Sequence, residues 1–354
     1  MPAWSYATIL LIPLISVVCL ILGGPLTWAV PVLVFGLVPL AEARLRGSHH
    51  NLSPEAEAGR RGRLWAYDAI IYAALALHIT LLAGFLVGIS VDRWSGLALA
   101  GAVATVGLSC GAIGINLGHE LGHRQRAFHQ WGARVALFSS LYLHFLVEHN
   151  RGHHTRVATP EDPASSRRGE WLYSFWLRSI SGSWRSAWAL EARRLGLKGQ
   201  GQFSPRNEVL TGAIAQGGAV LGVGLALGPA AAVAFVVVAA LGALLLETVN
   251  YIEHYGLSRG QRPDGRYERV TPLHSWTSDR PIGRALLFEL TRHADHHANA
   301  GRPYPVLRHF EAAPELPQGY PAMMVLALAP PLWFKVMDPH IDAEQARLRE
   351  AAAA

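Results

Sequence analysis

The hydrophobic positions of this chain gather into six long runs, separated by short turns and by two long polar segments. Each run holds about 20 mostly apolar residues, the length that an α-helix needs to cross the hydrocarbon core of a bilayer. Glycine and proline mark the junctions, as in Gly23-Gly24-Pro25 and Gly228-Pro229, where helices tend to end. The pattern predicts an all-α integral membrane protein with six transmembrane helices, over about 4–22, 25–40, 66–89, 96–117, 209–227 and 230–249.

The distribution of basic residues predicts how these helices are oriented across the membrane. Arginines follow the second run and are frequent in the segments 118–206 and 250–340, whereas the turns after the first and fifth runs contain no lysine or arginine. Basic residues accumulate in the cytoplasmic loops of membrane proteins. We therefore expect both termini and both long polar segments to be cytoplasmic, and the chain to form a single membrane-embedded domain over 1–354.

Composition supports this fold class and narrows the function. Hydrophobic residues make up 51% of the chain and charged residues only 16%, which is unusual for a soluble protein. The net charge of +6 does not indicate nucleic-acid binding, because the basic residues lie in loops beside apolar runs.

Two further apolar stretches are too short or too interrupted by proline to cross the membrane. We expect 134–147 to be a re-entrant, interfacial or buried helix and 320–337 to pack against the bundle.

Candidate chemistry lies in nine histidines that occur in four tight groups near the expected cytoplasmic ends of the runs. Three pairs are four residues apart, a spacing that places both members on one face of a helix. Imidazole is a common ligand of transition metals, and nine imidazoles are too many for one tetrahedral zinc ion. The groups predict a site for two metal ions, formed by His119, His123, His149, His153, His154, His254, His293, His296 and His297.

Acidic residues lie beside these histidines. Carboxylates in such positions commonly accept the free ring N–H of a ligand and fix its orientation, and one of them could instead bridge the two metals. The candidates are Glu120, Glu148, Glu253 and Asp295, with Asp162 in the proline-rich loop that follows the second group. Histidines outside the groups, such as His49 and His78, lack the spacing of ligands, and we interpret them as packing residues.

The motif H-E-L-G-H at 119–123 also allows a different interpretation. It matches the H-E-x-x-H pattern of zinc proteases, in which Glu120 would act as the base. Such a protease needs one further protein ligand and leaves seven grouped histidines without a role. A metal transporter or store is another alternative, but it would place ionisable residues along the middle of several spans, where only His78 lies deep in a run.

Taken together, the motifs resemble those of the membrane-bound alkane 1-monooxygenases, a family of integral-membrane non-haem di-iron hydroxylases. The resemblance covers about residues 30–340. It implies a six-helix bundle in which the nine histidines hold two iron ions. The motifs that carry it are H-E-L-G-H at 119–123, E-H-N-R-G-H-H at 148–154, N-Y-I-E-H-Y-G-L at 250–257, R-H-A-D-H-H at 292–297 and L-P-Q-G-Y-P at 316–321.

The resemblance also implies a reaction and partners. It implies hydroxylation of the terminal methyl of medium- or long-chain n-alkanes with O2, in the cytoplasmic membrane of a bacterium. Electrons would come from a rubredoxin, itself reduced by a reductase. Monooxygenases acting on aromatic methyl groups, as in xylene, and fatty-acyl desaturases also use clustered histidines and stay as alternatives. Candidate docking residues for an acidic rubredoxin are Arg124, Arg151, Arg167 and Arg168.

Overall fold

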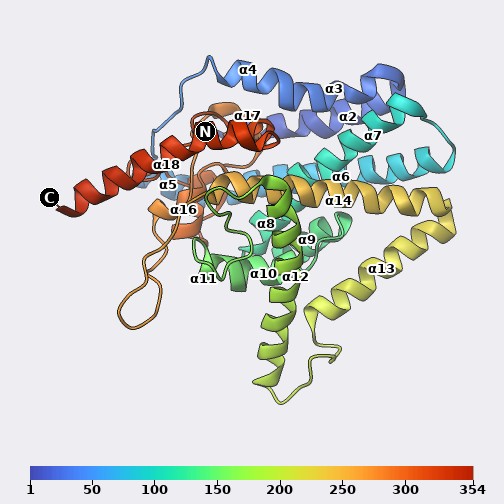
Figure 1. Cartoon of the computed structure of the whole chain (residues 1–354). Helices are drawn as coiled ribbons and strands as arrows, with labels where there is room; N and C mark the ends of the chain where they lie inside the picture. The colour runs from blue at the N-terminus through green and yellow to red at the C-terminus, as the bar shows by residue number, and fades with distance from the viewer. Residues whose placement is uncertain (354) are drawn as a thin grey trace.

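The computed structural model describes residues 1–353, which form helices and loops with two isolated β-bridges as their only strand pairing (Figure 1). Six helical segments are long and apolar enough to cross a membrane, which confirms the predicted fold class. The fourth and sixth extend beyond the predicted runs, because these helices continue into the histidine motifs. The six spans are Ala3–Leu22, Gly24–Glu42, Leu64–Ser90, Gly96–Gly122, Glu208–Leu227 and Pro229–His254.

Several spans are built from consecutive helical pieces. The first span is α1 (Ala3–Tyr6), η1 (Ala7–Leu10) and α2 (Leu11–Leu22), and the second is η2 (Gly24–Trp28), α3 (Ala29–Val32), η3 (Leu33–Leu37) and α4 (Val38–Glu42). The third is α6 (Leu64–Ser90), and the fourth is α7 (Gly96–Ser109), η4 (Cys110–Ile115) and α8 (Asn116–Gly122). The fifth and sixth are α13 (Glu208–Leu227) and α14 (Pro229–His254).

The fourth and sixth spans pack closely because glycines line their contact. A Cβ atom added to Gly242 of α14 would lie 2.7 Å from Cβ of Cys110, and one added to Gly111 of η4 would lie 2.9 Å from the carbonyl oxygen of Gly242. Small residues at such a contact let two helix backbones approach each other. The contact fixes α8, which carries His119, relative to the end of α14, which carries His254.

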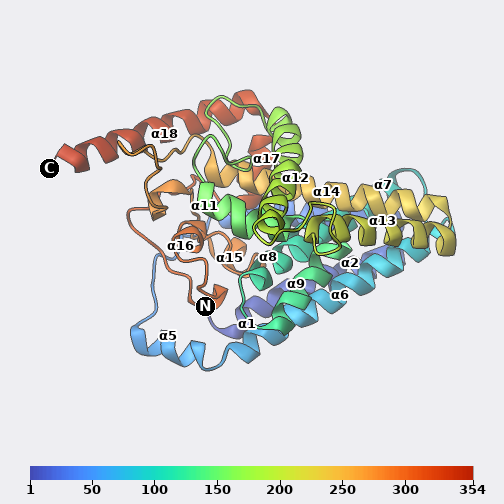
Figure 2. The same cartoon turned by 90° about the horizontal axis from the view of Figure 1, so that it is seen from below.

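The segments outside the spans supply the other histidines. These segments contain α5 (Pro54–Arg61), α9 (Ala127–Ser139), α10 (Phe145–Glu148), η5 (His149–His153), α11 (His154–Arg156), α12 (Leu172–Gly196), η6 (Pro272–His274), α15 (Pro281–Leu286), α16 (His293–Ala298), η7 (Tyr304–Val306), α17 (Tyr320–Ala327) and α18 (Pro330–Ala353). In Figures 1 and 2, the histidine-bearing α8, α11 and α16 lie away from the α13–α14 turn, toward the end of the bundle where both termini lie.

The stretch 320–337 packs against the bundle as expected, whereas 134–147 is not one helix, because α9 ends at Ser139 and α10 begins only at Phe145. Helix α9 has 13 residues, which at 1.5 Å per residue span about 20 Å and do not cross a bilayer. Helices α17 and α18 pack against the end of α14, where Tyr320, Trp333 and Met337 are fully buried in one cluster with Tyr251 and Tyr255. This cluster holds the C-terminal part of the chain beside the histidine motif of α14.

Candidate metal centre

The nine predicted histidines converge into two groups. The five-histidine group is His119, His123, His149, His154 and His296, and the four-histidine group is His153, His254, His293 and His297. Within each group, one ring nitrogen of every member lies within 4.8 Å of those of the others. The groups adjoin each other, since the ring centroids of His154 and His297 are 4.5 Å apart. Four segments distant in the sequence thus form two neighbouring clusters of nitrogen donors.

The facing nitrogens have the spacing of ligands around a metal ion. Nε2 of His149 lies 3.1 Å from Nε2 of His123 and 3.0 Å from Nε2 of His154. In the other group, Nε2 of His293 lies 2.9 Å from Nε2 of His297. Two nitrogens bound to one metal at about 2.0–2.1 Å each lie about 2.8–3.4 Å apart, for bond angles between the octahedral and the tetrahedral value. The donor set of each group therefore fits a transition-metal ion.

Burial keeps these imidazoles in the form that binds a metal. Burial and then the neighbouring imidazoles hold the pKa well below its usual value for His149, His154, His293, His296 and His297. Burial, with the His153 ring and Arg124, lowers the pKa of His123 to about 4. A metal binds the neutral imidazole, so these six side chains are ready to coordinate at neutral pH.

His149 and His153 fall into different groups, although their four-residue spacing suggests one helix face. They lie in the π-helical turn η5, where hydrogen bonding from i to i+5 widens the helix. Residue i+5 rather than i+4 then returns to the same side, so His154 joins His149 and His153 turns to the other group. The pairs His119/His123 and His293/His297 lie at α-helical positions and remain together.

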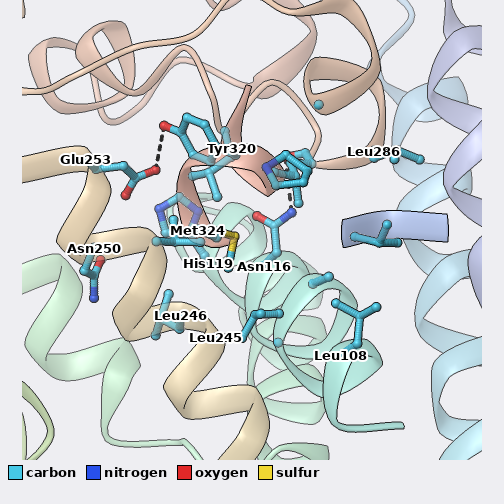
Figure 3. Close-up of a pocket in the computed structure, with 18 of the residues that line it drawn as sticks. Leu108, Asn116, His119, Leu245, Leu246, Asn250, Glu253, Leu286, Tyr320 and Met324 are labelled. Carbon is cyan, nitrogen blue, oxygen red and sulfur yellow. Dashed lines mark hydrogen bonds between the residues drawn. The ribbon is translucent and has the colours of Figure 1, made fainter. Parts of the chain in front are cut away.

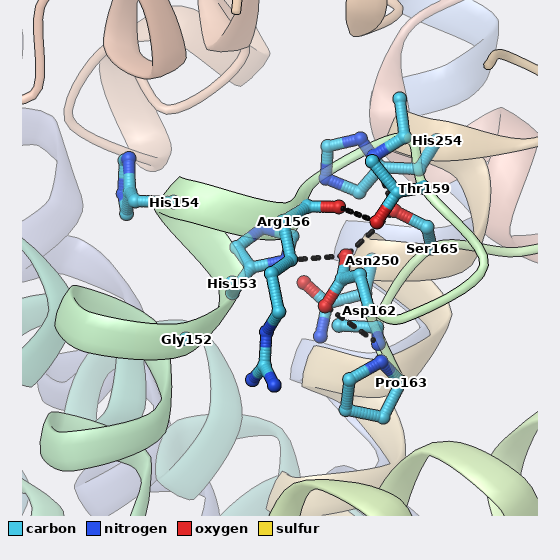
Figure 4. Close-up of polar contacts among 12 residues, drawn as sticks. Gly152, His153, His154, Arg156, Thr159, Asp162, Pro163, Ser165, Asn250 and His254 are labelled. Atoms are coloured by element: carbon cyan, nitrogen blue, oxygen red, sulfur yellow. Dashed lines mark hydrogen bonds and ion pairs between the residues drawn. The ribbon is translucent and has the colours of Figure 1, made fainter. Parts of the chain in front are cut away.

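Asp162 orients one of the histidines (Figure 4). Its Oδ2 lies 2.9 Å from Nδ1 of His153 and accepts a hydrogen bond from the Ser165 hydroxyl at 2.6 Å. The N–H of Ala164 donates to Oδ1 at 3.2 Å. Burial opposes ionisation of Asp162, but His153 and Ser165 outweigh it and hold the pKa of this carboxyl below its usual value. The contact fixes a proton on Nδ1 and leaves Nε2 facing the four-histidine group.

Three of the other flanking carboxylates contact arginines instead of ligand rings. The pairs are Glu120–Arg124 at 2.7 Å, Glu148–Arg156 at 2.8 Å and Asp295–Arg302 at 2.8 Å. Burial raises the pKa of Glu148 to about 7. These ion pairs tie the histidine-bearing segments to their surroundings. Because Arg124 holds Glu120, this carboxylate is not free to act as the base of a zinc protease.

Glu253 has a different position from all of these. Its Oε1 accepts a hydrogen bond from the Tyr320 hydroxyl at 2.9 Å, and its Oε2 lies 3.2 Å from Nε2 of His293. Tyr320 is a site residue that the sequence reasoning missed. The only signal was its place in the motif at 316–321, because a buried tyrosine is otherwise most simply interpreted as a packing residue.

An apolar cavity ends on both histidine groups (Figure 3). His119 and His149 of the five-histidine group and His293 of the four-histidine group all line it. Its walls come from the first, second, fourth and sixth spans and from α15 and α17, and include Leu108, Ala112, Leu245, Leu246, Leu286 and Met324. Near the histidines the few polar side chains are Asn116, Asn250, Glu253 and Tyr320. The cavity is therefore an apolar space beside the histidine nitrogens of both groups.

The histidines interpreted as packing residues lie outside both groups. Both ring nitrogens of His78 are hydrogen bonded, to Ser109 at 2.8 Å and to Ser139 at 3.0 Å. The ring of His49 stacks on that of His309, with centroids 4.3 Å apart. Neither side chain shares a nitrogen cluster with the nine predicted ligands.

Membrane-length helices with two nitrogen clusters at one end define an integral membrane protein with a possible two-metal site. Residues 92–327 match the family model described as fatty acid desaturase. The chain is 41% identical over 318 residues to alkane 1-monooxygenase 2 of Pseudomonas aeruginosa, covering 89% of this chain and 84% of that protein. The chain belongs to the alkane 1-monooxygenase family, as its motifs predicted.

Two further relatives show the breadth of the match. The alkane 1-monooxygenase of Ectopseudomonas oleovorans is 39% identical over 308 residues, which cover 87% of this chain and 76% of that protein. The xylene/toluene monooxygenase hydroxylase component XylM of Pseudomonas putida is 27% identical over 279 residues, which cover 76% of this chain and 72% of that protein. These two alkane 1-monooxygenases are thus more similar to this chain than XylM, which is named for xylene and toluene.

Proposed function

We propose that this protein is a di-iron monooxygenase that hydroxylates the terminal methyl of medium- or long-chain n-alkanes to 1-alkanols. The observation that carries the proposal is the apolar cavity that ends on both histidine groups. An alkane offers no polar handle, so a site can hold it only by shape and by burial of its surface. The identity to the alkane 1-monooxygenases supports this choice of substrate over xylene or a fatty-acyl chain.

In this proposal the nine histidines hold two iron ions, one in each group. Bound iron would supply the redox chemistry with O2 that a strong, nonpolar C–H bond requires. One oxygen atom enters the alkane and the other leaves as water, with two electrons and two protons consumed. The protein's own part is positioning: Asp162 orients His153, and the cavity walls exclude water and hold the terminal methyl near the histidines.

We further propose that the chain is one membrane-embedded domain whose termini and metal centre face the cytoplasm of a bacterium. The positive-inside pattern supports this orientation, and both termini lie toward the same end of the bundle as the histidine-bearing helices. A rubredoxin, reduced by its own reductase, would then deliver electrons from the cytoplasm. The Arg124 side chain is only 11% exposed beside Glu120 and Asp68, so docking would fall to Arg151, Arg167 and Arg168, which are exposed. Of these three, Arg151 and Arg168 also pair with acidic side chains of this chain.

The test is metal analysis of the purified protein, followed by turnover with reduced rubredoxin, O2 and octane, hexadecane or xylene as separate substrates. We expect 1-octanol or 1-hexadecanol, with one atom of 18O from labelled O2 in each product. Methylbenzyl alcohol as the main product would replace the alkane assignment with the aromatic one. Zinc at one equivalent with no oxygen-dependent product would refute the monooxygenase. A turnover rate that does not fall with added salt would refute electrostatic docking of the rubredoxin.

A further inference from the structure

Glu253 approaches a histidine on the edge of the ring that binds metal. Its Oε2 lies 3.2 Å from Nε2 of His293, the same nitrogen that lies 2.9 Å from His297 and 3.3 Å from His254. Asp162, in contrast, contacts Nδ1 of His153, at the opposite edge of the ring. A carboxylate that orients a ligand touches the rear nitrogen. A carboxylate at the front nitrogen lies among the donor atoms themselves.

The spacing at this front edge is that of a ligand. Donor atoms bound to one metal at about 2.0–2.2 Å lie about 2.8–3.6 Å apart, and the 3.2 Å between Oε2 and Nε2 falls within this range. The other oxygen, Oε1, is held by the hydroxyl of Tyr320 at 2.9 Å (Figure 3). Tyr320 is fully buried, so this hydrogen bond fixes the carboxylate with Oε2 directed at the four-histidine group.

Glu253 differs from the other buried carboxylates around the site in the partners of its side chain. Buried carboxylates are paired with a cation, fully hydrogen bonded, or bound to a metal. Glu120, Glu148 and Asp295 each pair with an arginine. Glu247, six residues earlier on α14, accepts hydrogen bonds from Tyr142, Ser179 and Asn250 instead. Among residues 1–353, Glu253 is 1% exposed and its side chain contacts only the Tyr320 hydroxyl and the His293 ring as polar partners.

We propose that Glu253 is a carboxylate ligand of the metal in the four-histidine group, held in place by Tyr320. The inference rests on the two-metal site of the proposed function. Because Glu253 also lines the apolar cavity, it occupies the side of this metal that faces the substrate. The two metals are then unequal: one has five neutral donors, whereas the other has four neutral donors and one anion. The anion lowers the net charge at the second metal and favours its higher oxidation state.

The test uses cobalt(II) alone, without alkane, O2 or an electron donor, in the full-length protein. We expect Glu253→Gln to weaken the binding of one of two cobalt equivalents by about tenfold or more, because the effect of losing a ligand exceeds that of losing an orienting contact. We also expect the visible spectrum of the fully loaded variant to differ from that of the wild type, because the donor set has changed. If Glu253→Gln does not fold, Glu253→Asp, which withdraws the carboxylate, receives the same measurements.

Asp162→Asn is the matched control. This variant should also weaken the binding of one cobalt equivalent. The fully loaded variant should nevertheless keep the wild-type spectrum, because the atoms that bind cobalt are unchanged. Weaker binding in Glu253→Gln with an unchanged spectrum would overturn the proposal, since Glu253 would then only orient His293. Unchanged affinity and spectrum would overturn it as well. Failure to hydroxylate alkanes would refute the proposed function and leave this cobalt result standing.

Discussion

Replacing Asp162 by asparagine should selectively weaken the four-histidine group. The ionised carboxylate accepts from His153 and Ser165 on Oδ2 and from the N–H of Ala164 on Oδ1. An asparagine side chain has one acceptor oxygen and one NH2 donor. If its oxygen faces His153, the NH2 faces the N–H of Ala164. If the amide is reversed, the NH2 faces the ring N–H of His153. Either orientation places two donors against each other.

The magnitude follows from the role of Asp162 as an orienting partner. Loss of such a partner typically lowers metal affinity 10- to 100-fold, which corresponds to about 1.4–2.8 kcal/mol. The effect should be confined to one of two equivalents, because His153 is the grouped histidine whose ring Asp162 contacts, and the five-histidine group does not include that residue. The side chain of Asp162 is buried, so solvent cannot replace the lost contact.

The assay is a chelator titration of the fully loaded protein, with the metal that remains bound measured by mass spectrometry. The wild type should release its metals at high chelator concentration, and Asp162→Asn should release one equivalent at a 10- to 100-fold lower concentration. Glu161→Gln is the control, because it removes a charge at the adjacent, exposed position. Release of both metals at the wild-type concentration in Asp162→Asn, or an equal effect in the control, would refute the reasoning.

Three further predictions concern the site and its surroundings. His297→Ala should lose about one of two metal equivalents and all hydroxylation, whereas His49→Ala should change neither, as measured by metal analysis and product formation. Ala112→Phe should shift the products toward shorter alkanols in gas chromatography, because it fills the cavity wall. His144→Phe should lessen the loss of stability in acid. Burial lowers the pKa of His144 to about 4, so the folded state resists a proton that the unfolded state binds below about pH 6.5.

The acid effect at His144 comes from protons that the unfolded state binds and the folded state does not. The unfolded state binds more protons between about pH 6.5 and pH 4, so stability is lost as the pH falls through this window. At pH 5 the loss from His144 is about 2 kcal/mol, and thermal melts at pH 7 and pH 5 should show it as a smaller acid shift in His144→Phe. An equal acid shift in both proteins would contradict the assignment. Iron retention by His297→Ala, or unchanged products from Ala112→Phe, would contradict the other two.

The helical spans could be read from the sequence because each is a local pattern of apolar residues ended by glycine, proline or charge. The nine histidines could be selected for a similar reason, since their grouping is visible along the chain. Their division into five and four could not be predicted, because it depends on the local hydrogen bonding of η5. The same residues can form an α-helical or a π-helical turn, and the tertiary fold determines which of the two begins at His149.

The roles of the acidic residues could not be predicted from the sequence either. Glu120, Glu148, Glu253 and Asp295 are each adjacent to a grouped histidine along the chain. In space, three of them turn to arginines, and Glu253 turns to the metal-facing edge of His293. Which way a side chain points depends on the partners that tertiary packing brings near it, and Tyr320 approaches Glu253 from a segment 67 residues away.

The π-turn at 149–153 sets a limit on how this segment can vary. A π-turn holds one more residue than an α-turn of the same height, so removing a single residue here would restore α-helical geometry and rotate everything that follows. His154 would then move out of line with His149, and one metal would lose a donor. Substitution of the exposed Arg151 leaves the residue count intact. At Arg151 the segment should therefore tolerate a change of side chain far better than the loss of the residue, so the number of residues between the two histidines is under stricter constraint than the identity of this one.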